Sequence, residues 1–183
     1  MIMPPRFRKI VLTTHVVTSV GWLGAVLAYL ALDITAVTSQ DVSTVRGAHA
    51  AMEVTVLYAI VPLALTSVLV GIVNALGTAW GLLRHYWVLV KLLLTVFAAT
   101  VLLIETQTVS HLAEMSRSSA DPRELPGTLF HSVGGLVVLL IIAVLSMFKP
   151  RGLTRYGWRK QNEQRARQLP ATSANQAPDL TAR

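Results

Sequence analysis

Four long apolar stretches constrain the fold of this 183-residue chain more than any other feature. They cover roughly residues 10–32, 52–76, 86–108 and 127–148. Each holds about 22–25 residues, and about 20 helical residues cross a hydrocarbon core ~30 Å thick. Each stretch must be helical because lipid cannot hydrogen-bond to an open backbone. The sequence therefore predicts an all-α fold, a four-helix transmembrane bundle.

The composition agrees with lipid as the main solvent, since 53% of the residues are hydrophobic, 14% are charged and the mean hydropathy is +0.56. A water-soluble domain is more highly charged. The formal net charge of +7 does not indicate nucleic-acid binding, because the basic residues gather at the chain ends beside apolar runs. The chain has no cysteine, which excludes disulfides, thiolate metal sites and iron–sulfur clusters.

The orientation follows from Lys and Arg, which collect in cytoplasmic segments. The first nine residues and the tail after residue 148 carry most of them, whereas the 33–51 and 109–126 connections hold few. Both termini are therefore expected in the cytoplasm. Short connections favour an up-down bundle in which the first and third helices are diagonal partners, as are the second and fourth.

The same pattern divides the chain into three parts. We expect a cytoplasmic N-terminal segment at 1–9, a four-helix transmembrane domain at 10–148 and a basic cytoplasmic tail at 149–183. The tail starts with aromatic and basic residues suited to the headgroups of an anionic leaflet. Its end is small, polar and proline-bearing, so part of the tail is expected to be disordered.

Polar residues inside the apolar stretches are the candidate functional residues. A Lys at mid-helix costs about 2.5–3.5 kcal/mol on insertion scales, so each ionisable group needs a partner or a function. Depth along the helices sorts them into an inner layer near the cytoplasm and an outer layer. The inner layer is His15, Lys91 and Asn74, and the outer layer is His49, Glu53, Glu105, Thr128 and His131.

The two layers fall on the two diagonals of the bundle, so His15 is expected to face Lys91, and His49 to face His131. Haem b needs one or two axial imidazoles between apolar walls. Plainer readings apply to the same residues. A histidine near a helix end is often an interfacial group, Lys91 can extend to the cytoplasmic headgroups, and the glutamates can lie at the wet ends of their helices.

Two further features support a flat ligand between the helices. Trp22 lies on the same side of the first helix as His15, and Gly134 and Gly135 beside His131 leave room for a flat ring. Close helix packing explains the two glycines equally well. His111 falls beyond the third apolar stretch and is expected in a loop.

The runs "RKIVLTTHVVTSVGWLGAVLAYLAL", "HYWVLVKLLLTVF" and "FKPRGLTRYGWRK" resemble the four-helix membrane family that groups HemJ-type protoporphyrinogen oxidases with CopD-type copper-resistance proteins, and in particular an actinobacterial branch of it. The HemJ-type resemblance implies haem b as cofactor and maps the functional pair onto His15 and Lys91. The chain departs from that pattern at "LDITAVTSQ", where those proteins carry Pro-Arg and further aromatic and histidine residues. The resemblance therefore implies haem binding more than porphyrinogen oxidation, in the inner membrane of a bacterium.

The leading hypothesis is a haem-b protein with a redox role, and if it is an enzyme, a membrane haem-dependent oxidoreductase. Lys91 would be catalytic, His15 an axial ligand, His131 or His49 the second ligand, and Trp22 and Asn74 would line the cofactor. The expected partners are the lipid bilayer, a redox partner or a quinone-like or porphyrin-like substrate, and a second copy of the chain.

Two other classes of function stay open. Copper or metal transport would use His15, His131, His49, Glu53 and Glu105, although the chain has no Met-rich or His-x-His run. A non-catalytic accessory subunit would bind a partner helix through the small residues of the first helix, such as Gly21 and Gly24.

Overall fold

The structure is a computed structural model, and it describes residues 3–77, 86–118, 121–148, 152 and 154–168. The described residues form helices and contain no strand. The elements are α1 (Pro5–Thr38), α2 (Val42–Thr55), the π-helix η1 (Val56–Ile60), α3 (Val61–Leu76), α4 (Tyr86–Ser118), the 3-10 helix η2 (Pro122–Glu124), α5 (Leu129–Phe148) and α6 (Arg155–Gln168).

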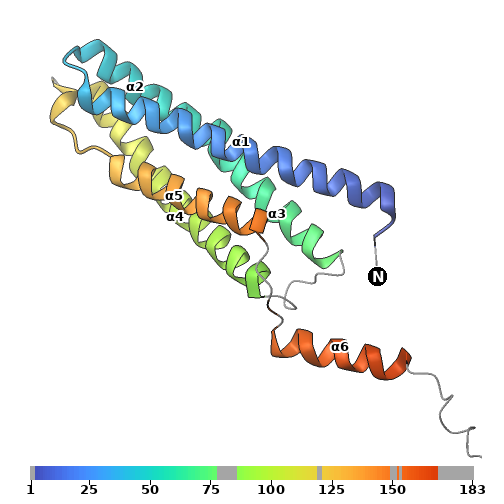
Figure 1. Cartoon of the computed structure of the whole chain (residues 1–183). Coiled ribbons are helices and arrows are strands. Elements are labelled where there is room, and N and C mark those ends of the chain that lie inside the picture. The colour runs from blue at the N-terminus through green and yellow to red at the C-terminus, as the bar shows by residue number, and fades with distance from the viewer. Residues whose placement is uncertain (1–2, 78–85, 119–120, 149–151, 153, 169–183) are drawn as a thin grey trace, which may run out of the picture.

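Four helical spans are long and apolar enough to cross a membrane: α1, the continuous α2–η1–α3 rod, α4 and α5. They form a bundle in which α1 packs against the α2–η1–α3 rod and α5, and α4 packs against the same two elements (Figure 1). The diagonal partners are therefore α1 with α4, and the rod with α5. This confirms the predicted all-α, up-down four-helix bundle, and it fits an integral membrane protein.

The helices are longer than the apolar stretches, so the expected connections at 33–51 and 109–126 were too long. The turn from α1 into the rod takes only a few residues, because Asp41 caps α2 by accepting hydrogen bonds from the backbone N–H groups of Ser43 and Thr44. The hydrogen bond from the Ser43 hydroxyl, followed by those from the hydroxyl and backbone N–H of Thr44, holds the pKa of Asp41 well below its usual range. His111, expected in a loop, is an exposed residue of α4.

At the N-terminal end, helix α1 begins at Pro5, so much of the predicted cytoplasmic segment 1–9 is helical. The described part of the tail is helical as well, and α6 lies apart from the bundle (Figure 1). The predicted disorder of the tail end falls on residues 169–183, which lie outside the described residues, as do Arg84 and His85.

A π-helical turn interrupts the second span at mid-length. Pro62 has no backbone N–H and would clash with the carbonyl four residues earlier in a regular helix. The chain widens instead, and the Val61 N–H donates to the carbonyl of Val56, five residues back. Val56 and Ile60 are both buried and belong to the main apolar core. Single π turns of this kind often occur at functional sites.

Close packing at one point of α1 follows from a small residue. A Cβ added to Gly21 would lie 3.4 Å from Leu63 of α3, so the glycine lets the two helices approach. Gly24, also part of the predicted small-residue set, faces open space.

Candidate functional site

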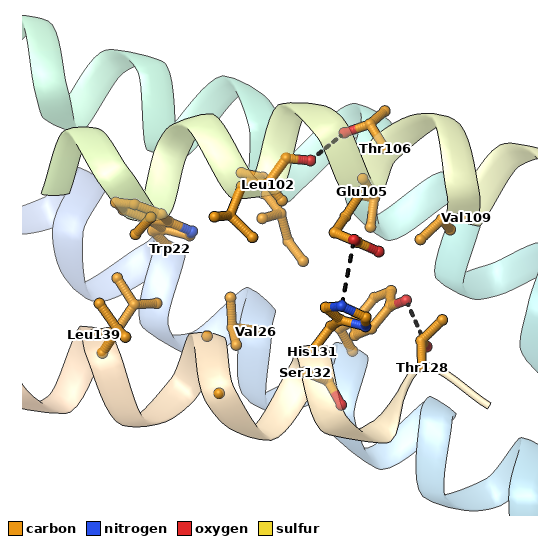
Figure 2. A pocket seen from close by; sticks show the side chains of 18 of the residues that line it. Trp22, Val26, Leu102, Glu105, Thr106, Val109, Thr128, His131, Ser132 and Leu139 are labelled. Atoms are coloured by element: carbon orange, nitrogen blue, oxygen red, sulfur yellow. Dashed lines mark hydrogen bonds and ion pairs between the residues drawn. The ribbon is translucent and has the colours of Figure 1, made fainter. Parts of the chain in front are cut away.

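The core of the bundle contains a cavity of about 310 Å³ between α1, η1, α4 and α5. Its walls are mostly apolar, with Trp22 and Val26 from α1, Leu102 from α4 and Leu139 from α5 among the lining residues (Figure 2). This volume lies at the lower end of the ~300–1,000 Å³ typical of ligand pockets. The size and the apolar walls of the cavity suit a small apolar ligand.

One polar contact in the cavity is the pair His131 and Glu105. Figure 2 shows His131 of α5 pointing across the cavity toward Glu105 of α4, with 3.5 Å between Nε2 and Oε1. Both side chains line the cavity. A carboxylate in this position orients the imidazole and leaves the other ring nitrogen for a ligand.

The cavity extends to the lipid-facing surface between α4 and α5. Phe97 and Phe130 both line it, and they are 60% and 87% exposed. Gly134 and Gly135 widen it on the α5 side, because a Cβ at either position would meet no atom within 4 Å. A ligand dissolved in the bilayer would therefore have a lateral route into the core.

A buried carboxylate lies beside the cavity. Asp33 of α1 is only 1% exposed, and its Oδ2 accepts hydrogen bonds from Thr128 Oγ1 at 3.0 Å and Ser132 Oγ at 2.8 Å. The Tyr29 hydroxyl lies 3.2 Å from Thr128 Oγ1. Tyr29, Thr128 and Ser132 all line the cavity. These hydrogen bonds join the outer ends of α1 and α5.

The sequence analysis did not predict Asp33 or Tyr29 as site residues. Asp33 lies just beyond the first apolar stretch, and Tyr29 lies within it as one of its aromatic residues. Helical spacing was the signal that could have found them. Trp22, Val26, Tyr29 and Asp33 follow one another at intervals of four, three and four residues, so they share one face of α1, and all four are buried.

His15 contacts α3. Its Nδ1 lies 3.1 Å from the backbone oxygen of Ser67, and since a carbonyl only accepts, the imidazole donates from Nδ1 and leaves Nε2 free. Ser67 also bonds to Ser19 through their hydroxyls at 2.8 Å. Gly71 makes room for the ring, because a Cβ there would lie 2.9 Å from His15 Cε1.

The other inner-layer residues make fewer contacts. Lys91 is half-buried, and its charge is near enough to act electrostatically on His15. None of the ion pairs in the described ranges involves Lys91. Asn74 is also half-buried. The residues that line the cavity do not include His15, Lys91 or Asn74.

The outer layer does not assemble as expected. His49 does not face His131 but is buried against α4, where its Nδ1 lies 3.1 Å from Ser116 Oγ. Glu53 pairs with Arg117 of α4. The reason is that His49 and Glu53 belong to α2, which packs against α4 and contributes no residue to the cavity. Among the residues that the structure describes, no three His, Asp or Glu side chains lie close enough to hold a metal ion. Of the proposed copper ligands, His131 and Glu105 meet, but the five residues do not form one site.

The fold and the cavity together define a multi-pass membrane protein with an internal ligand-sized space open toward the bilayer. Comparisons with family models, with curated proteins and with solved structures found no match to this chain.

Proposed function

We propose that this chain is an integral membrane protein that binds haem b in the core cavity and has a redox role, with His131 as the axial ligand. The observation that carries the proposal is the pairing of His131 with Glu105 inside a mostly apolar cavity. A haem site needs an oriented imidazole and apolar walls, and this cavity supplies both.

The residues present fit the cofactor in two respects. The imidazole of His131 keeps one ring nitrogen free while the other faces Glu105. Gly134 and Gly135 leave open space beside it for a flat ring. No second histidine is among the residues lining the cavity. His131 would therefore be the residue that holds the haem, which would supply redox chemistry when bound.

His15 is the rival ligand, and the HemJ-type resemblance favours it. Its Nδ1–H donates to the Ser67 carbonyl, an arrangement common for ligating histidines because it leaves Nε2 for the metal. Lys91 would then serve as a charge partner for a propionate or as the catalytic residue. Since His15 does not line the cavity, the two assignments place the haem at different depths and are separable.

The test is a visible spectrum of protein purified after expression with a haem supply, recorded oxidised and reduced. We expect a Soret band in the native chain and in His111→Ala, an exposed-histidine control, and none in His131→Ala. Glu105→Gln should weaken haem affinity about tenfold or more, as outer partners of ligands typically do. Absence of the band in the native chain would overturn haem binding, and its loss in His15→Ala alone would overturn the assignment to His131.

A second candidate is a lipid-soluble ring compound, of the quinone-like or porphyrin-like class, in the same cavity. The lateral opening beside Phe97 and Phe130 favours it, since such a compound would come from the bilayer. Trp22 in the wall provides a probe. A short-chain quinone should quench tryptophan fluorescence in the native chain and leave a smaller saturable change in Trp22→Phe. Equal quenching in both would reject this candidate.

A further inference from the structure

Asp33 is the buried ionisable group that cofactor binding does not use. It is only 1% exposed in the outer part of α1, a spanning helix. A neutral hydroxyl or amide could tie α1 to α5 equally well, whereas removing a carboxylate from water costs several kcal/mol before compensation, on the order of the figures for buried ions. Ionisable groups kept inside a membrane helix are functional candidates for this reason.

The Asp33 carboxyl group accepts hydrogen bonds from the start of α5. Two hydroxyls donate to Oδ2, from Thr128 and Ser132. Both donors belong to the start of α5, where Thr128 also accepts the first backbone bonds of the helix. The N-terminus of a helix favours a nearby negative charge. These contacts offset the cost of burying the carboxylate.

The hydroxyls form a chain with a defined direction. The single proton of the Thr128 hydroxyl points to Asp33, so Thr128 accepts the hydrogen bond from the Tyr29 hydroxyl. Ser132 differs, since its proton goes to Asp33 or to the Leu129 carbonyl and no described residue donates to its oxygen. The continuous path therefore runs from Tyr29 through Thr128 to Asp33.

The first two members of the path line the cavity. Two titratable groups of other helices lie near the path. Glu105 of α4 acts electrostatically on Tyr29, and His49 of α2 lies within electrostatic reach of Asp33. His131, on the same helix as Thr128, faces Glu105 instead. A proton donor beside Tyr29 is thus separated from the buried carboxylate by two hydroxyl groups, whereas a donor beside Ser132, which also lines the cavity, is separated from it by one.

We propose that Tyr29, Thr128 and Asp33 form a proton-transfer chain between the cavity and a buried carboxylate. The proposal rests on the function proposed for the same cavity and extends that function. It implies that the ligands of the cavity give up or take up a proton when they bind. The transfer is balanced within the chain. An O–H bond in the cavity breaks as Tyr29 takes its proton, Tyr29 passes its own proton to Thr128, and Thr128 passes its own to Asp33, which becomes the carboxylic acid.

The test uses the full chain in lipid nanodiscs without haem, so that water is the proton source. After a rapid pH jump, infrared absorption follows the carboxylic acid band of Asp33, identified by its loss in Asp33→Asn. We expect Thr128→Val and Tyr29→Phe to slow this band by on the order of 100-fold, the scale at which a positioned proton carrier contributes. Thr128→Ser keeps the hydroxyl and should restore the native rate.

Ser132→Ala is the matched control, because it removes a hydrogen bond to the same oxygen without cutting the path. A purely structural role predicts equal effects of Thr128→Val and Ser132→Ala, and that result would overturn the proposal. So would an unaltered rate in both Thr128→Val and Tyr29→Phe, or a carboxyl group that does not titrate. Because no haem is present, these outcomes are independent of the Soret test, and either proposal can fail alone.

Discussion

The two halves of the bundle differ in how tightly they are packed. The outer half contains α2 and the ends of α1, α4 and α5 near Asp33, Ser116 and Thr128, and the inner half contains α3 and the ends near His15, Lys91 and Met147. In the outer half, Asp33, Val45, Met52 and Ser116 are at most 1% exposed, and α2, α4 and α1 bury them together. In the inner half, α4 buries no residue before Ala99 and α3 none after Ser67. The outer half therefore holds the helices together, and the inner half has fewer contacts to lose when a helix moves.

The polar groups follow the same division. The outer hydroxyls and carboxylates are closed into hydrogen-bonded sets, such as that of Asp33 with Thr128. The inner half has the hydrogen bond of His15 and a lysine that joins no described ion pair. The cavity lies between the two halves, with polar partners at its outer end and apolar walls toward the inner end. Changes in the outer half should therefore affect stability most.

The largest loss of stability is expected from Asp33→Ala. The change leaves the Thr128 and Ser132 hydroxyls without their acceptor and opens a space between α1 and α5. Leaving a buried hydroxyl without its acceptor costs about 1–3 kcal/mol for each of the two, measurable as a shift of the unfolding midpoint in detergent. Asp33→Asn keeps the shape and an acceptor oxygen and should lose much less. Equal stability of Asp33→Ala and the native chain would contradict the role of this contact.

The next largest loss is expected from Met52→Ala, which leaves a void at a fully buried position of α2. Met52 is 1% exposed, whereas Met147 at the inner end of α5 is 81% exposed. Truncating a buried Met costs about 3 kcal/mol, and Met147→Ala should change the unfolding free energy little. Comparable losses for the two variants would remove the distinction between the halves.

A smaller effect is expected from His15→Ala in the inner half. The variant loses one neutral hydrogen bond to the Ser67 carbonyl, worth about 1 kcal/mol. The same unfolding titration, with His111→Ala as an exposed control, measures it. A loss as large as that of Asp33→Ala would show that the inner half carries more of the stability than its packing indicates.

The smallest and most local effect is expected from acid at the outer loop. Hydrogen bonds from Arg123 lower the pKa of Asp121 to about 2, and Arg123 also donates to the Gln40 carbonyl beside α2. A carboxyl group with a lowered folded-state pKa contributes stability above its unfolded pKa of about 3.9, and this is lost as the pH falls toward 2. Protection of the Arg123, Glu124 and Leu125 backbone N–H groups from hydrogen exchange, relative to their intrinsic rates at each pH, should therefore fall over that range.

Asp121→Asn is the control for the acid effect. The amide cannot titrate, so exchange in the loop should be faster than in the native chain at neutral pH and should change less on acidification. If the native chain and the variant respond to acid equally, another group controls the loop.

The two halves also differ in how much could be predicted from the sequence. Val56, Ile60 and Ser67 of the second span follow one another at intervals of four and seven residues, so helical periodicity places them on one face, and all three are buried. The outer partners were not found, because they join residues about a hundred positions apart, such as Asp33 and Ser132. His49 was placed at the correct end of the bundle but opposite the wrong partner.

The sequence by itself determined the four spans, their helical form and the diagonal order of the bundle, because lipid permits only helices over such apolar lengths and short connections permit few arrangements. Only the tertiary structure decided that His131 meets Glu105 in a cavity and that Asp33 is buried beneath Thr128. Periodicity gives the face of each helix but not its rotation and height against its neighbours. Those depend on side-chain packing across the bundle, and here also on the extra turn width at Val56–Ile60.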